Sequence, residues 1–142
     1  MQRLDRSRLI GRTFPNAIEI PVRFDDLDIQ AHVNNVAVAV IFEEARARFN
    51  RGHVLADWVA AGGSAVVAGV QLEFAGEMDW HPLHIRTGVL EVGRSSFLLG
   101  QIASQHGIDT AFAETMLVTT RDGGSAPFPD AVRAKLEAAL IA

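Results

Sequence analysis

Residues 34–50 read NNVAVAVIFEEARARFN, and this pattern predicts a helix over 36–50. Asn34 or Asn35 is a suitable N-cap, because its amide oxygen can accept a free backbone N–H. At about 100° per residue, three polar side chains share one narrow arc: Glu43, Arg46 and Asn50. Most of the remaining surface is apolar, interrupted by Glu44 and Arg48 at the i,i+4 spacing of an ion pair. A helix that is apolar on nearly all sides is expected to be buried on nearly all sides.

A period of two precedes this helix and predicts a strand over 17–25 with one buried face. The side chains expected to point inward from this strand are Ile18, Ile20, Val22 and Phe24. Pro21 cannot donate to a hydrogen-bond ladder, so the strand is expected to lie at a sheet edge or to carry a bulge.

Alternating or β-rich patterns follow the central helix. A short helix is predicted over 54–60, and strands are predicted over 68–74, 83–92, 97–104 and 111–121. Connections of about four residues, at 93–96 and 106–109, indicate an antiparallel meander. Good helix formers after Pro129 predict a C-terminal helix over 129–142.

This order of elements predicts the α+β class, with an antiparallel sheet of about five strands wrapped around one long central helix. We expect a single domain over 1–142, with 1–14 as an N-terminal extension. One sheet cannot cover so apolar a helix on all sides, and open edge strands also favour a partner. The chain is therefore expected to form a homodimer or a homotetramer built from dimers.

Composition narrows the functional classes. The 142 residues are 49% hydrophobic and 21% charged, and the net charge is −4, which is typical of a globular domain without a nucleic-acid-binding surface. The absence of cysteine excludes disulfides, thiolate metal sites and a cysteine nucleophile. No apolar run reaches the roughly 20 residues of a membrane helix, so no membrane contact and a cytoplasmic location are expected.

Two motifs carry a family resemblance. DLDIQAHVNN at 26–35, followed by FEEAR at 42–46, resembles the signature of hotdog-fold acyl-CoA and acyl-ACP thioesterases, in their 4-hydroxybenzoyl-CoA thioesterase-like branch. VGRSSF at 92–97 and AETMLV at 113–118 are similar to that branch as well. The resemblance covers about 16–130 and implies the hotdog fold, which matches the layout predicted from the residues.

Asp28 is the main catalytic candidate. Thioester hydrolysis needs either a water activated by a base or a carboxylate that attacks the carbonyl directly. The helix N-terminus after Asp28 offers N–H groups and a positive dipole end to a developing oxyanion. In the enzymes that this sequence resembles, the aspartate at this position is the nucleophile or general base. Asp26, two residues earlier, is expected to be structural, and Glu44 is an alternative catalytic carboxylate.

Two further residues complete the expected catalytic set. His32 could orient a water, transfer a proton or only brace the loop by hydrogen bonding. Asn34 could polarise the thioester carbonyl with its side-chain amide, or serve only as the N-cap. The expected substrate-binding residues are Gln30, Val33 and Asn35 near the helix start, and Arg94, Ser95 and Ser96, which could contact CoA phosphates.

Asp79, His81 and His84 surround a proline and could in principle hold a metal ion. One short cluster interrupted by a proline is weak support, so the sequence predicts no metal site. The resemblance likewise implies no metal or redox cofactor.

The predicted function is hydrolysis of an acyl-CoA or acyl-ACP, with a place in fatty acid metabolism. One alternative is a hotdog enoyl-thioester hydratase or dehydratase, which would also use an acid and a histidine. A second alternative is a non-catalytic acyl-CoA-binding module, since fold does not dictate function. Plant-type acyl-ACP thioesterases have asparagine where this chain has Gln30, and the chain lacks tyrosine, so the binding module stays open. The continuation Val33-Asn34-Asn35 favours hydrolysis over hydration.

Overall fold

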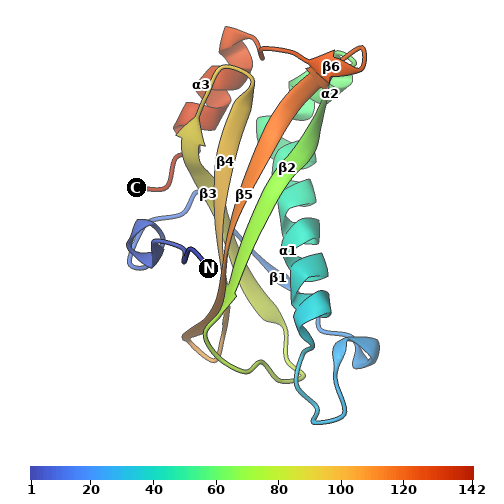
Figure 1. The fold of residues 1–142 in the computed structure, drawn as a ribbon, viewed down its shortest axis with the longest axis vertical. Helices are drawn as coiled ribbons and strands as arrows, with labels where there is room; N and C mark the ends of the chain where they lie inside the picture. The colour runs from blue at the N-terminus through green and yellow to red at the C-terminus, as the bar shows by residue number, and fades with distance from the viewer.

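The computed structural model describes all 142 residues and contains one curled antiparallel sheet, which wraps around a long helix (Figure 1). Its strands are β1 (Asn16–Ile20), β2 (Ser64–Phe74), β3 (Leu83–Val92), β4 (Ser96–Gln105), β5 (Ile108–Arg121) and β6 (Gly124–Ser125). The strand order is β1-β3-β4-β5-β2, and the two-residue β6 pairs with β5. All of these neighbours are antiparallel, and β3, β4 and β5 form the meander that the two short connections predicted.

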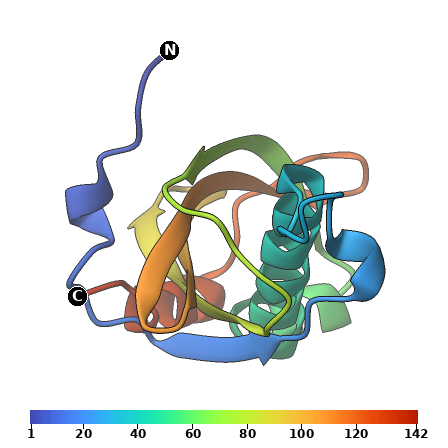
Figure 2. The same cartoon turned by 90° about the horizontal axis from the view of Figure 1, so that it is seen from below.

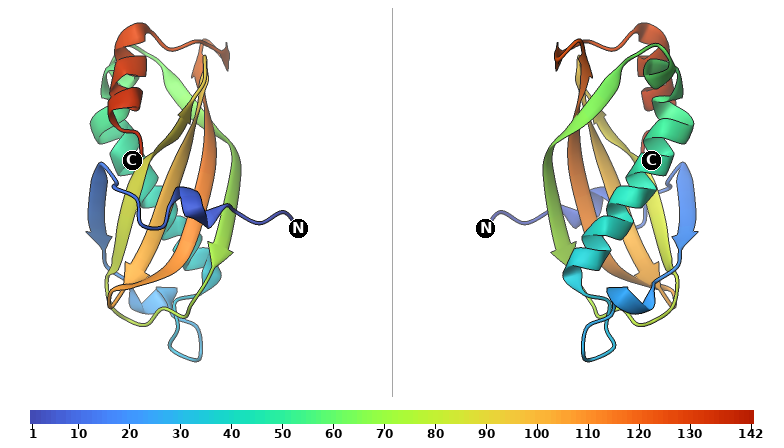
Figure 3. Two further views of the ribbon diagram at one scale, coloured as in Figure 1. Left: turned by 90° about the vertical axis from the view of Figure 1, so that its left-hand side faces the viewer. Right: turned by 90° about the vertical axis from the view of Figure 1, so that its right-hand side faces the viewer.

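The helices are α1 (Asn35–Phe49), α2 (Ala56–Ala60) and α3 (Asp130–Ala138). Short 3-10 turns occupy Arg6–Arg8 and Phe24–Asp26, and a π-helical turn over Asn50–Val54 continues α1. Figure 3 shows α1 lying diagonally across the concave face of the sheet, with α3 at the end where α1 finishes. This is the hotdog arrangement that the sequence predicted. None of the helices is long and apolar enough to cross a membrane.

The main core lies between α1 and the sheet. Its helical part includes Val38, Ile41, Phe42 and Ala45, which pack against Leu83 and Ile85 on β3 and alanines on β4 and β5. A second cluster at the far end of α1 contains Phe49, Trp58, Phe97 and Leu136. Full burial of one such large side chain contributes about 1.5–3 kcal/mol. Packing on this scale, rather than helix propensity, holds the β-branched α1 in place.

The N-terminal extension covers the opposite, convex face of the sheet, as Figure 2 shows. Leu4 and Leu9 are buried there against Ile102 and Phe112. The contact requires a glycine at Gly100, because a Cβ at that position would lie 2.5 Å from a Leu9 methyl carbon. The extension is therefore part of the packed domain.

The first strand is shorter than predicted. β1 ends at Ile20, directly before Pro21, which cannot continue the ladder. Residues Phe24–Asp26 turn instead, and Phe24 is 72% exposed, so the prediction that it points inward was wrong. Its ring packs edge-on against Trp80 with centroids 5.8 Å apart. The predicted edge position is confirmed, since β1 pairs only with β3.

The polar arc of α1 is only partly exposed. Glu43 is exposed, but Arg46 and Asn50 are each only 7% exposed. Burial lowers the pKa of the Arg46 guanidinium, with the nearby Glu43 carboxylate opposing this change. The predicted pair of Glu44 and Arg48 is present, at 3.2 Å.

The C-terminal helix is shorter than 129–142, because α3 ends at Ala138. The last residues are extended and hydrogen-bond to two other segments. The Ile141 N–H donates to the Val89 carbonyl at 2.8 Å, and Ala142 exchanges backbone hydrogen bonds with Thr13. These bonds join the C-terminus to β3 and to the segment before β1.

Apolar surface remains exposed along one side of α1 and on β2, the other free edge of the sheet. The exposed side chains are Val36 and Val40 on α1, and Val66, Val67 and Val70 on β2. A groove of about 380 Å³ between the two elements is lined by Val36, Val40, Val70 and Leu72, with Glu43 and Arg46 at its far end. One sheet thus leaves part of α1 uncovered, as the sequence predicted.

Candidate active site

Residues 27–33 form a small closed loop that leads into α1. Leu27 and Val33 pair as an isolated antiparallel bridge, and the Asp28 N–H donates to the His32 carbonyl at 2.7 Å. Ala31 adopts a left-handed conformation with φ 61°, which reverses the chain at the loop tip. The loop is therefore a defined turn that presents its side chains at the end of the sheet.

The Asp28 carboxylate is held by this loop. Its Oδ1 accepts hydrogen bonds from the backbone N–H of Gln30 at 2.8 Å and of His32 at 3.1 Å. The side chain is exposed, and Oδ2 receives no hydrogen bond from the protein. Asp28 is thus a carboxylate with one oxygen fixed and the other facing solvent, an arrangement that can bind and activate a water.

The N-cap of α1 lies six residues after Asp28. Asn34 is the N-cap: its Oδ1 accepts from the Ala37 N–H at 2.8 Å, and its Nδ2 donates to the Asp26 carbonyl at 3.0 Å. The first N–H groups of a helix have no intrahelical acceptor. Those of Asn35 and Val36, both exposed residues, also have no other protein acceptor. They are available to a carbonyl oxygen that gains negative charge.

Asp26 anchors the start of the loop. Its carboxylate accepts from the Arg23 N–H at 2.8 Å and from the Arg23 guanidinium at 3.1 Å. Burial acts to raise the pKa of Asp26, but these hydrogen bonds outweigh it and the pKa lies below its ordinary value. These contacts hold Asp26 against the backbone and a cation, which fits the structural role expected for it.

His32 lies on the other side of the loop. It is half-buried, and its Nε2 lies 3.3 Å from a carboxylate oxygen of Glu77 in the β2–β3 connection. A cavity of about 410 Å³ opens beside this pair, lined by His32, Glu77, Asp79, Gln105 and His106 together with neighbouring residues. His32 therefore faces a cavity at the sheet end rather than the core.

The sequence model of the thioesterase-like superfamily matches residues 22–136, which include the Asp28 loop, α1 and every strand except β1. The chain belongs to the thioesterase-like superfamily. Comparison with curated protein sequences gives no match.

Solved structures agree with this membership. This thioesterase-like protein is similar to a thioesterase from Thermus thermophilus whose crystal structure contains coenzyme A and Zn, with 29% identity and a TM-score of 0.78 over 88% of this chain and 93% of that one. A thioesterase superfamily protein from Jannaschia sp. has 18% identity and a TM-score of 0.82 over 100% of this chain and 99% of that one. A Staphylococcus aureus protein in complex with CoA has 14% identity and a TM-score of 0.78 over 86% and 81%. The last two similarities establish the fold only.

The predicted site residues of the thioesterase-like protein fall into two groups. Those near Asp28 are together: His32 and Gln30 share its loop, Val33 is buried beneath the loop, and Asn34 and Asn35 start the helix. Arg94, Ser95 and Ser96 lie in the β3–β4 turn, at the opposite end of the sheet (Figure 1). About ten residues of strand, at about 3.3 Å per residue, separate the two ends. One chain therefore does not bring these three residues to Asp28.

Three residues beside the Asp28 loop were not predicted from the sequence. Glu77, Gln105 and His106 line the cavity next to His32 but lie 45 to 74 residues after it in the chain. The hairpin at 106–109 was predicted, and antiparallel topology places its turn at the same sheet end as the β2–β3 connection. This topology is the one feature of the sequence prediction from which the proximity of His106 to the β2–β3 connection could have been inferred. His84, in contrast, lies within β3 opposite Glu19 and does not join Asp79 and His81.

Proposed function

We propose that this protein hydrolyses acyl-CoA thioesters and that Asp28 is the catalytic carboxylate. The observation that carries the proposal is the position of Asp28. Its exposed carboxylate is fixed by two backbone N–H groups directly before the helix terminus of a thioesterase-like fold. The Thermus thermophilus relative, crystallised with coenzyme A, supports CoA as the carrier of the acyl group.

The reaction needs a base and a site for the oxyanion. In the base route, Asp28 accepts a proton from water while the water oxygen bonds to the thioester carbonyl carbon. The N–H groups of Asn35 and Val36 stabilise the oxyanion, a contribution of about 10²–10³-fold where such donors are well placed. The C–S bond then breaks, the sulfur takes the proton, and a carboxylic acid and free CoA leave.

In the alternative route, Asp28 attacks the carbonyl carbon itself and displaces the thiolate. Water then hydrolyses the mixed anhydride and restores the carboxylate. A single turnover in ¹⁸O-water tests for the anhydride. Incorporation of ¹⁸O into Asp28 indicates an anhydride that water opens at the Asp28 carbonyl, whereas incorporation only into the acid product indicates that water attacks the acyl carbon, as it does in the base route.

The neighbouring residues have supporting roles in this proposal. His32, held beside Glu77, braces the loop from which its backbone N–H donates to the Asp28 carboxylate. Both polar groups of the Asn34 side chain are already hydrogen-bonded, so Asn34 positions the helix start rather than contacting the substrate. Gln30 and Val33 shape the loop. Arg94, Ser95 and Ser96 can contact CoA phosphates at this site only where a second copy contributes them.

We propose further that the protein is a homodimer through β2 and the exposed side of α1. β2 is an edge strand with three exposed valines, and Val36 and Val40 extend the apolar surface onto the helix. Natural proteins rarely leave a long apolar edge strand uncovered. A second copy would close the groove between α1 and β2, which starts near the free N–H groups and is a suitable place for the acyl chain. Association of two dimers into a tetramer is compatible with this interface.

Release of free thiol from a panel of acyl-CoAs tests the function. The panel should include short, long and aromatic acyl groups and one acyl-ACP. The chain has no cysteine and adds no thiol background. We expect Asp28→Asn to lower kcat by at least about 100-fold while keeping its fold, because asparagine retains the Oδ1 acceptor of the loop but cannot act as a base. Asp25→Asn, which changes an exposed carboxylate nearby, is the matched control and should keep its activity.

The outcomes separate the alternatives. Thiol release that persists in Asp28→Asn would show that the reaction is right and the residue wrong, and Glu44→Gln would be tested next. A change in enoyl absorbance without thiol release would indicate a hydratase. Tight binding of acyl-CoA without turnover would indicate a binding module.

A further inference from the structure

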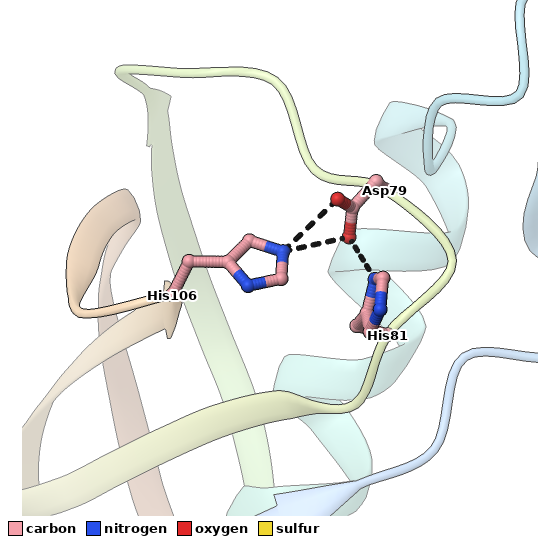
Figure 4. Close-up of side chains that lie close together, drawn as sticks. All are labelled: Asp79, His81 and His106. Atoms are coloured by element: carbon pink, nitrogen blue, oxygen red, sulfur yellow. Dashed lines mark hydrogen bonds and ion pairs between the residues drawn. The ribbon is translucent and has the colours of Figure 1, made fainter.

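Three potential metal ligands converge at the sheet end beside the Asp28 loop. Asp79 and His81 come from the β2–β3 connection, and His106 comes from the β4–β5 turn (Figure 4). One oxygen or nitrogen atom from each residue lies within 4.8 Å of the others. The His81 Nδ1 is 2.8 Å from Asp79 Oδ1, and the His106 Nε2 is 2.9 Å from Asp79 Oδ2. Two segments far apart in the sequence thus place their side chains around one point.

The backbone around this point is held by one buried side chain. Gln105, immediately before His106, hydrogen-bonds to the Asp79 N–H, the Asp79 carbonyl and the His81 carbonyl. His106 itself has a φ of 52° and is followed by Gly107 at 74°, the left-handed pair of a tight hairpin turn. The two ligand-bearing segments are therefore joined rigidly, although their side chains are half exposed.

The donor set and its spacing suit a transition metal. Two imidazole nitrogens and one carboxylate oxygen are preferred ligands of Zn²⁺, which binds nitrogen and oxygen at about 2.0–2.2 Å. Ligands of a tetrahedral ion at this bond length lie about 3.4 Å apart. The imidazole nitrogens lie 2.8 and 2.9 Å from Asp79, so each would move outward by about 0.5 Å to reach the spacing of a tetrahedral ion, a shift open to half-exposed side chains. Exposure of His81 and His106 leaves space for water as further ligands.

We propose that Asp79, His81 and His106 form a binding site for one divalent transition metal ion, with Zn²⁺ as the best-matched ion. An ionised carboxylate only accepts hydrogen bonds, so without metal the His81 Nδ1 and the His106 Nε2 carry the protons that face Asp79. On binding, those two nitrogens coordinate the ion through their lone pairs. Each neutral imidazole then carries its proton on the other ring nitrogen, so the step needs no net gain or loss of protons.

The site differs from the sequence prediction of no metal, and it does not depend on the proposed hydrolase activity. His106 follows His81 by 25 residues, so local spacing could not reveal it. The ion would border the cavity that also contacts His32. It would tie the β2–β3 connection to the hairpin, and that connection already accepts a hydrogen bond from Val33 through the Met78 carbonyl at 2.8 Å.

Calorimetric titration with zinc chloride tests the site, using protein without a histidine tag that has been stripped with a chelator. We expect one ion per chain. Loss of a residue that only hydrogen-bonds to a metal ligand weakens metal binding by about 10–100-fold. His106→Ala and Asp79→Asn each remove a ligand itself, so each should weaken zinc binding by at least that factor. His53→Ala is the matched control, because His53 is an exposed histidine in the π-helical turn at the opposite end of α1. It should bind zinc like the wild type.

Long-range ¹H–¹⁵N spectra of the wild type identify the ligands without any substitution. We expect zinc to shift the His81 Nδ1 and His106 Nε2 resonances. In each ring, the proton should move to the nitrogen that does not bind zinc. Zinc-dependent shifts confined to His32, His53 or His84 would overturn it. Wild-type protein that binds no zinc, or His106→Ala that binds as tightly as wild type, would overturn it as well.

Discussion

The side chain of Gln105 holds Asp79 at both backbone polar groups: its Oε1 accepts from the Asp79 N–H at 2.9 Å, and its Nε2 donates to the Asp79 carbonyl at 3.0 Å. The same nitrogen donates to the His81 carbonyl at 2.7 Å. Gln105 is 5% exposed at the end of β4, so this buried contact connects the β2–β3 connection to the sheet. We therefore expect the shape of this sheet end to depend on one residue.

Gln105→Ala should destabilise the protein by about 1–3 kcal/mol, because it leaves the Asp79 N–H and the His81 carbonyl without a partner and removes one of the two donors to the Asp79 carbonyl. The free energy of unfolding from urea titration measures this loss. Gln71→Ala removes a comparable amide whose hydrogen bond to Gln2 is exposed, so it should change stability by less than about 0.5 kcal/mol. Equal urea midpoints for Gln105→Ala and wild type would contradict the role of this contact. The same variant should also weaken zinc binding.

Asn34→Ala should cost about 1–2 kcal/mol, because it removes the side-chain oxygen that caps α1 at the Ala37 N–H. Asn34→Asp keeps that acceptor and loses only the donation to the Asp26 carbonyl, so its stability should lie between alanine and wild type. Urea unfolding followed by circular dichroism ranks the three proteins. An alanine variant as stable as the aspartate variant would show that the cap contributes little.

Acid stability should depend on Asp26. Its carboxyl has a lowered pKa in the folded state, so its contribution to stability is present above the ordinary aspartate pKa. That contribution is lost as the pH falls from about 4 through the folded pKa. Asp26→Asn should therefore be less stable than wild type at pH 7. As the pH falls below about 4, it should lose less stability than wild type does. Free energies of unfolding at several pH values test this, with Asp25→Asn expected to follow the wild-type profile.

Val70→Lys should convert the proposed dimer to a monomer, because a charged side chain would be buried on the β2 edge beside α1. Sedimentation velocity should show the wild type at twice the 15.4 kDa chain mass and the variant at the single mass. Ile10→Lys changes an exposed apolar residue of the N-terminal segment and should leave the dimer intact. A monomeric wild type, or a variant that sediments like it, would remove support for this interface.

Local patterns predicted a helix or strand well where the buried side chains recur with the period of that element, about 3.6 residues in a helix and two in a strand. The apolar run from Val36 became helix α1, which is buried on the side that faces the sheet, and β3 has the bounds expected from its alternation. Pro21 marked an edge strand for a reason intrinsic to proline, its missing N–H. The same pattern extended the strand too far, because alternation cannot show that Phe24 contacts Trp80 instead of the core.

Burial around α1 could not be read from its helical wheel alone. Arg46 and Asn50 lie on a polar arc in sequence, yet both are buried, since the curl of the sheet and the turn after α1 determine what covers that arc. The wheel gives only the direction of a side chain. The neighbours in that direction come from segments far along the chain.

Short-range sequence therefore specifies the loop around Asp28 and its place before α1, because the capping by Asn34 and the carboxylate's hydrogen bonds join residues at most four positions apart. Contacts between distant segments depend on the completed sheet. The meeting of His106 with Asp79 and the pairing of His32 with Glu77 arise because antiparallel register brings the β2–β3 connection and the β4–β5 turn to one end. The same register places Arg94, Ser95 and Ser96 at the other end, a separation that no local spacing encodes.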